Sequence, residues 1–294
     1  IKEQIEMSNI KINREEVMRR GIVAVIMCVM LALPVVAGAA DNPWEKKLPF
    51  KSAAIRYELS GMETGEEMLY IRKHGQEMAR HHSGKTSMFG MSAKTRTVQI
   101  TTPDWVYQFD LEEGTGSKSI NPQKLMIEEY NKLSKSEKKQ VQKNAEEMGT
   151  SMMSGMQGSI EKDAKEILGY SCDKTTFMGS TIYSIHETPI ALFSDTNIMG
   201  MKVKSIATSV EKGKVDDKYF TFPDGIEPQP NPDADKMARM MAQQTIAALK
   251  DPEGFKQNTP AQSQAPSKTA SQSAPEGEQP QEAPSAEDQA VEQT

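Results

Sequence analysis

Cysteine and aromatic residues are scarce in this chain of 294 residues, and positive charge is not in excess. It contains two cysteines, aromatic residues make up 6% of it, and its formal net charge is −6 at neutral pH. Cys28 lies in an apolar run near the N-terminus, so removal of that run leaves Cys172 alone and excludes an intramolecular disulfide. The absence of a basic excess argues against a nucleic-acid partner, because such proteins carry clustered positive charge.

The neighbours of Cys172 give no reason for an activated thiol. The surrounding residues 169–174 contain no histidine and no helix start that would lower the pKa of a cysteine. We therefore expect Cys172 to be buried as a small hydrophobic side chain, and a reactive thiol is the alternative.

Recognisable enzyme motifs are missing as well. The sequence has no Gly-Lys-Ser/Thr phosphate loop, no Gly-x-Ser-x-Gly nucleophile elbow and no His-Glu-x-x-His metal pair. The dipeptide His186-Glu187 stands alone. The sequence therefore predicts a protein that is not an enzyme and that needs no cofactor.

What the chain does have is a pattern typical of a bacterial export signal at residues 18–40. Arg19 and Arg20 precede an apolar segment at 22–33, and small residues at 37–40 supply a cleavage site. The apolar run is shorter than the roughly 20 residues that span a bilayer. We expect cleavage and no permanent membrane span, with an uncleaved anchor as the alternative.

The export signal also predicts where the protein starts and where it works. Residues 1–17 are polar and precede the signal, so we interpret them as a non-native extension, with translation starting at Met18 or at Met7. The mature chain would begin near Asp41. The predicted location is the periplasm of a Gram-negative type of bacterium, or the outside of the cell.

Two regions of the mature chain are rich in strand patterns. Ile55, Tyr57 and Leu59 alternate with charged residues, which is the period of a half-buried strand. Similar segments separated by turn residues continue to Leu111. Strands resume at Glu166 and are expected to end with an edge strand at 218–222.

Helical patterns lie between and after these β-rich regions. Residues 122–158 are predicted to be helical, and Ser134 with Glu137 has the form of a capping box. A second helix is predicted at 233–250, with Asp233 as its N-cap. Its expected apolar positions are Met237, Met241, Ile246 and Leu249.

The order strands, helices, strands, helix predicts an α+β fold. One curved antiparallel sheet, an incomplete β-barrel covered by helices, would occupy residues 41–227. Its concave face would be a natural ligand site. Residues 257–294 contain one lysine, six acidic residues and no aromatic residue. That composition is typical of a disordered tail, which serves either as a passive spacer or as a docking segment.

Three segments carry a resemblance to a known group. Residues 167–173, 199–208 and 220–225 stand in an order and spacing similar to those of the LolA/LolB-like superfamily of periplasmic lipoprotein carriers. The chain resembles uncharacterised exported proteobacterial proteins of that type more closely, over roughly residues 50–227. The resemblance implies an incomplete barrel with a helical lid that holds lipid acyl chains.

The candidate ligand-lining residues are the apolar side chains of the predicted strands and of the methionine-rich helix end. Methionine is flexible and suits an adaptable lid over varied apolar ligands. An ordinary core and a loosely packed helix end are the alternatives. The candidates are Ile55, Tyr57, Leu59, Trp105, Tyr107, Phe109, Met152, Met153, Tyr170 and Val203.

A second candidate site is a group of histidines and methionines. His81, His82, Met88 and Met91 combine imidazole and thioether groups, which suit copper ions. Strand alternation would place His81 and His82 on opposite faces, so surface histidines beside core methionines are the alternative.

These observations predict an exported periplasmic binding protein that holds a lipid, an acyl chain or another apolar ligand in a concave sheet. One alternative is an envelope interaction module that binds a protein partner through its acidic tail. Another is a copper-binding protein that uses the histidine and methionine group.

Overall fold

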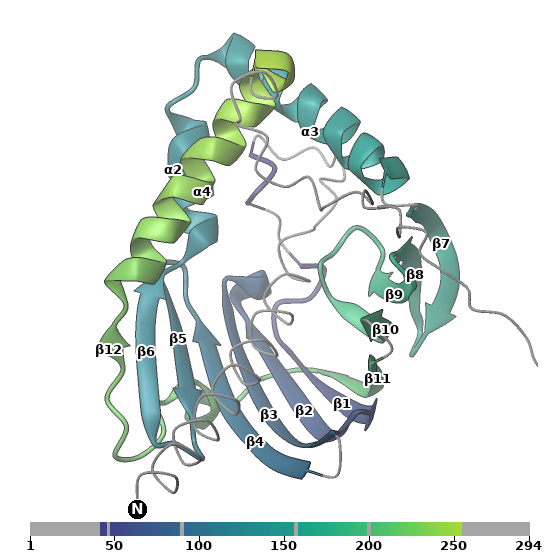
Figure 1. Ribbon diagram of the computed structural model, residues 1–294, viewed down its shortest axis with the longest axis vertical. Helices are drawn as coiled ribbons and strands as arrows, with labels where there is room; N and C mark the ends of the chain where they lie inside the picture. The colour runs from purple at the N-terminus through teal and green to yellow at the C-terminus, as the bar shows by residue number, and fades with distance from the viewer. Residues whose placement is uncertain (1–41, 46–47, 89–90, 156–157, 199–200, 255–294) are drawn as a thin grey trace, which may run out of the picture. The chain divides into compact units, whose positions relative to one another are not determined.

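The computed structural model describes residues 42–254, apart from 46–47, 89–90, 156–157 and 199–200 (Figure 1). The predicted export signal and acidic tail lie outside these described residues. One sheet of twelve strands has the order β12-β6-β5-β4-β3-β2-β1-β11-β10-β9-β8-β7. The pairs are antiparallel except for β12 on β6. The sheet has two free ends and is not closed, which confirms the predicted α+β fold with a curved, incomplete barrel.

The strands fall into two groups on either side of the helical insertion. The first group is β1 (Ala53–Gly61), β2 (Glu63–Arg72), β3 (Glu77–Met88), β4 (Met91–Thr101), β5 (Trp105–Asp110) and β6 (Thr115–Ile120). The second is β7 (Ser159–Ile167), β8 (Tyr170–Phe177), β9 (Ser180–Ile185), β10 (Ala191–Ile198), β11 (Met201–Lys212) and β12 (Gln229–Pro230). β1 pairs with β11, so the two groups form one continuous sheet.

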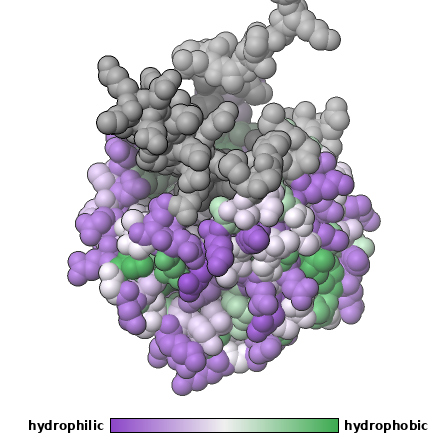
Figure 2. Space-filling view, turned by 60° about the horizontal axis from the view of Figure 1, so that its bottom comes forward, coloured by the Kyte–Doolittle hydropathy of each residue, from purple (hydrophilic) through white to green (hydrophobic). Residues whose placement is uncertain are grey.

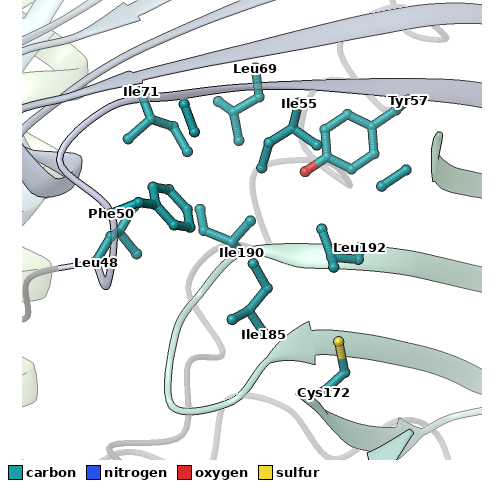
Figure 3. Packing of buried hydrophobic residues seen from close by; sticks show 12 residues of the cluster. Leu48, Phe50, Ile55, Tyr57, Leu69, Ile71, Cys172, Ile185, Ile190 and Leu192 are labelled. Carbon is teal, nitrogen blue, oxygen red and sulfur yellow. The ribbon is translucent and has the colours of Figure 1, made fainter. Parts of the chain in front are cut away.

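The inner face of β1 and β2 carries the largest buried cluster. Every second residue of β1 is apolar, and Ile55 lies opposite Leu69 of β2. These side chains pack against residues of β8, β9 and β10, so the sheet curves around a core (Figure 3). The cluster consists of Leu48, Phe50, Ala53, Ile55, Tyr57, Leu69, Ile71, Cys172, Ile185, Ile190, Leu192 and Ala207.

A second cluster lies on the outer face, the opposite side of β2 to β5. Its buried members are Tyr70, Ala79, Val98, Ile100, Phe109 and Val215. The chain after β11 covers this face with the short 3-10 helix η2 (Asp217–Phe220), and Tyr219 stacks on Tyr70 with ring centroids 3.8 Å apart. The predicted edge strand at 218–222 is therefore wrong, because these aromatic side chains lie on the sheet instead of pairing with its edge.

Three helices pack on one another beyond the β6 end of the sheet. They are α2 (Pro122–Asn131), α3 (Lys135–Gly155) and α4 (Pro232–Lys250). The predicted capping box before α3 is confirmed, because Ser134 N–H donates to Glu137 Oε2 at 2.8 Å and Glu137 N–H donates to Ser134 Oγ at 3.3 Å. Among the described helices, none is long and apolar enough to cross a bilayer.

The start and the apolar face of α4 differ from expectation. Asn231, not Asp233, caps the helix, since its side chain accepts a hydrogen bond from Ala234 N–H at 3.0 Å. Ile246 is buried with Tyr130 of α2 and Val141 of α3. Of the other three positions that were expected to form the apolar face, only Leu249 is buried in the same cluster. Met237 and Met241 are 52% and 41% exposed.

Candidate functional site

The structure places some predicted lining residues together on the inner face. Ile55 and Tyr57 are fully packed in the inner cluster and are core residues. Leu59 and Val203 follow at half-buried positions of the same face. Tyr170 packs against the cluster, with its ring 6.4 Å from that of Phe50 in an edge-on contact. The inner face is therefore filled at Ile55 and becomes more accessible toward Leu59.

The aromatic residues of β5 lie on the other side of the sheet. Phe109 pairs with Gly116 and is buried in the outer cluster. Its ring and that of Tyr107 both pack against the ring of Phe222, with centroids 5.2 and 4.7 Å apart. Trp105 shares their face by strand alternation. These three side chains therefore lie on the outer face, opposite to that of Ile55, and the segment after β11 covers the outer face of β5.

The histidine and methionine group does not converge on one point. His81 lies on the outer face, where its Nε2 is 2.9 Å from the carbonyl oxygen of Tyr219. His82 lies on the inner face between two carboxylates. Met88 and Met91 pair across the β3–β4 hairpin. The side chains of these two methionines, like those of Met152 and Met153 in α3, lie outside the described part of the structure.

The inner face instead carries a compact charged cluster, which we call the acid–base cluster: Glu63, Glu67, Arg80 and His82. His82 Nε2 lies 2.8 Å from Glu63 Oε1, and its Nδ1 lies 3.4 Å from Glu67 Oε2. Arg80 donates a hydrogen bond to the other oxygen of Glu67. The side chains of Glu63, Glu67 and His82 are about nine-tenths buried, so these charges are compensated mainly by one another.

The register of the β2–β3 hairpin builds this cluster. Glu67 lies opposite His82, and Gly65 lies opposite Gly84. A Cβ atom on Gly84 would come within 2.4 Å of Glu63 Oε1, so this glycine leaves the space that the carboxylate occupies. Because Gly84 has no side chain, the carboxylate of Glu63 can lie over it and reach the imidazole of His82.

Charge pairing outweighs burial in setting the protonation of the cluster. Burial by itself lowers the pKa of His82, but hydrogen bonds and charge attraction from Glu63 and Glu67 raise it to about 9. Burial would likewise raise the pKa of Glu67, yet the Arg80 guanidinium and His82 hold it below its usual value. His82 is therefore a paired cation at neutral pH, with both ring nitrogens directed at carboxylates, and not a general base.

Polar side chains continue from this cluster along the inner face of β4, β5 and β6. They alternate with the apolar residues of the outer cluster, so the polar side of these strands is the inner side. The half-buried residues with hydroxyl or amide groups there are Thr97, Gln99, Thr101, Gln108, Ser117 and Ser119, and the carboxyl group of Asp110 and the apolar Val106 lie among them. The inner face thus changes from an apolar core at β1 to hydroxyl and amide groups at β4–β6, with the acid–base cluster between them.

Two ionisable groups, a phenol and a thiol, are buried in the apolar part of the inner face. The Tyr57 hydroxyl donates to the Ala191 carbonyl oxygen at 3.0 Å, and burial raises its pKa above the ordinary value. Cys172 is fully buried, as expected, and burial raises the pKa of its thiol. Neither group is poised for reaction, because deprotonation would place a charge in an apolar core.

The acid–base cluster was missed by the sequence reasoning, apart from His82. Its signal was present, since Glu63, Gly65 and Glu67 occupy alternate positions of one strand. Two acidic residues on the same face as Leu69 are unusual unless a cation pairs with them. That signal could not name Arg80, because the register of the hairpin decides which side chain lies opposite.

One surface of the molecule is predominantly hydrophilic. Figure 2 shows hydrophobic residues there only in small groups separated by polar ones. A large exposed apolar patch, which often marks a contact surface, is absent from the described residues of this view.

No protein-family model and no curated protein matches the chain. Among solved structures, it is similar to an uncharacterized conserved protein from Thermus thermophilus, with a TM-score of 0.36 and 8% identity over 62% of this chain and 92% of that one. Two structures of PNGF-II give TM-scores of 0.31 and 0.29 at 11% and 13% identity, over 64% and 67% of this chain. The match spans a third of the PNGF-II chain. These comparisons assign the protein to no family and identify no enzymatic activity.

Proposed function

We propose that the protein is an exported binding protein, not an enzyme, that holds a lipid or acyl-chain ligand on the inner face of its curved sheet. The observation that supports this is the change in chemistry along that face. Leu59, Val203 and Met78 present partly accessible apolar groups on or beside the core. The hydroxyl and amide groups of β4–β6 lie beyond the acid–base cluster.

An amphipathic ligand matches such a face better than a purely apolar one. Its chain would contact the apolar residues near Leu59 and Val203, and its polar end would hydrogen-bond to residues such as Thr97 and Gln99. The acid–base cluster lies between these parts and holds equal numbers of acidic and basic groups. It would therefore orient a polar end group without favouring either sign of charge.

The location and the relationship to lipoprotein carriers are parts of the same proposal. They rest on the export signal at 18–40 and on the spacing of the segments at 167–173, 199–208 and 220–225. The open, curved sheet with helices beyond its β6 end agrees with that resemblance in outline.

The test pairs a variant of the inner face with one of the outer face. Leu59 and Ile206 are half-buried aliphatic residues on neighbouring strands, and the register directs them to opposite faces. We expect Leu59→Ser to weaken uptake of a fluorescent fatty acid several-fold and Ile206→Ser to leave it unchanged. Native mass spectrometry of protein from its own host should show co-purifying lipid. Protein that carries and takes up no lipid, or equal effects of the two variants, would contradict the proposal.

A further inference from the structure

A second cluster of ionisable side chains lies far along the sheet from the acid–base cluster. Asp163 belongs to the edge strand β7, Asp173 to β8, and His186 to the turn after β9. Each contributes one oxygen or nitrogen atom, and these three atoms lie within 4.8 Å of one another. Three separate segments therefore direct potential metal ligands to one point.

The three atoms lie close enough to reach one small ion, although one pair is now at hydrogen-bonding distance. His186 Nδ1 lies 2.6 Å from Asp173 Oδ1 and 3.5 Å from Asp163 Oδ1. Metal–ligand bonds near 2.1 Å place neighbouring ligand atoms about 3.0–3.5 Å apart. A small adjustment of the two aspartates would accommodate an ion between the three atoms.

The surroundings hold both aspartates by hydrogen bonds, as outer-shell groups do in metal sites. Glu187 Oε1 lies 3.9 Å from His186 Nε2, beyond hydrogen-bonding distance but close enough for charge attraction. Asp173 accepts hydrogen bonds from the backbone N–H groups of Asp163 at 3.0 Å and Glu187 at 3.2 Å. Ser171 donates its hydroxyl to Asp163 Oδ1 at 2.5 Å.

The site is open to solvent on one side. The side chain of Asp163 is 60% exposed and that of His186 is 34% exposed, whereas Asp173 is only 12% exposed. An ion can therefore enter without unfolding the sheet and retain water in its remaining positions. Zinc sites that keep a coordination position open to water have three protein ligands, as this site would.

We propose that Asp163, Asp173 and His186 bind a divalent transition-metal ion such as Zn²⁺. The imidazole favours such an ion over Ca²⁺, which prefers six to eight oxygen ligands. Coordination through Nδ1 needs a neutral imidazole that carries its proton on Nε2. A doubly protonated ring would release the Nδ1 proton to solvent, a neutral ring would move it to Nε2, and the ion would replace the hydrogen bond to Asp173. The ion would join β7, the edge of the sheet, to β8 and to the turn after β9.

The proposed metal site is separate from the proposed lipid site and from the histidine and methionine group. His81 and His82 lie on β3, on opposite faces, whereas the proposed metal site uses a different histidine and two aspartates. Substitutions at the metal site should leave fatty-acid uptake unchanged.

The test is isothermal titration of the untagged full chain with ZnCl₂ and, separately, with CaCl₂. We expect one equivalent of Zn²⁺ to bind and Ca²⁺ to bind much more weakly. Asp163→Asn and His186→Gln should each weaken Zn²⁺ binding at least about tenfold. Glu166→Gln is the matched control, because it removes the same charge from an exposed position of β7 and should bind Zn²⁺ as the unaltered chain does.

A second measurement does not depend on the variants. X-ray absorption of the zinc-loaded chain should show a shell of oxygen and nitrogen atoms with one imidazole. Failure to bind one equivalent of Zn²⁺, a shell with sulfur or several imidazoles, or folded variants with unchanged affinity would overturn the proposal.

Discussion

Strands β1 and β5 belong to the same sheet, yet they bury opposite faces. In β1, Ile55 points to the inner core, and Arg56 is exposed on the outer side. In β5, Phe109 is buried on the outer side, and Gln108 faces inward. Both strands have the same alternation of apolar and polar residues. In both strands the apolar side is the buried one, and the difference teaches that what packs on the strand decides whether this side lies on the inner or the outer face of the sheet.

Strand β2 lies where the change occurs. Ile71 is buried in the inner cluster and its neighbour Tyr70 in the outer one. Toward its other end the inner face of the same strand carries Glu63 and Glu67. The buried apolar side chains therefore change from the inner to the outer face of the sheet at β2. The acid–base cluster lies on the inner face at the position where the apolar residues end.

The largest expected effect tests the outer side of β5. Phe109→Ala should lower the free energy of unfolding by about 3–5 kcal/mol, since it empties a fully buried position. Gln108→Ala, on the inner side of the same strand, should cost well under 1 kcal/mol. Urea denaturation measures both changes. A larger loss for Gln108→Ala would reverse the assignment of faces.

In the matching experiment on β1, the substitution on the inner side should cause the larger loss of stability. Ile55→Ala is expected to destabilise the protein by about 2–5 kcal/mol, because Ile55 is completely buried on the inner side. Glu58→Ala on the exposed outer side should change the stability by about 0.5 kcal/mol or less. Comparable losses from both substitutions in urea denaturation would show that the inner core is not packed around β1.

A third prediction addresses the acid–base cluster between these regions. Arg80→Met should destabilise the protein by about 3 kcal/mol at neutral pH, because it leaves the buried Glu67 carboxylate without its guanidinium partner. Adding Glu67→Gln should recover part of the loss, which a double-mutant cycle in urea would measure. Strictly additive losses would mean that the two side chains do not stabilise one another.

The smallest expected effect concerns pH. The pKa of His82 is about 9 in the folded protein and near 6.5 when unfolded. The stabilisation from its protonated form is therefore complete below pH 6.5 and is lost as the pH rises through 9, by on the order of 1–3 kcal/mol. The melting temperature should fall more between pH 6.5 and 9.5 in the unaltered protein than in His82→Gln. Parallel profiles would exclude the raised pKa.

Local sequence signals located most of the secondary structure. The alternation at 55–59 marks β1 and the capping box at Ser134 marks the start of α3. Cys172 is buried, as the absence of an activating neighbour predicted. Strand β6 was missed, because Thr115–Ile120 is mostly polar. Strand β7 was missed up to Glu166, because its residues are largely exposed and a bulge interrupts its pairing.

The candidate site was less predictable than the fold. Leu59 and Val203 share the inner face, but Trp105, Tyr107 and Phe109 do not. Asp163 and Asp173 carried no signal as scattered acidic residues. They meet His186 only because β7, β8 and the turn after β9 are neighbours at the end of the sheet.

The sequence by itself determined the alternation of β-rich and helical regions, the amphipathic character of strands such as β1 and the cap of α3. These properties depend on neighbours within a few residues, so they can be recognised before the chain is folded. Only the tertiary structure decided which face of each strand is covered and which ionisable groups meet. Residues 215–226 pack on the outer face of β2–β5 from more than 100 positions away, and no local pattern specifies that contact.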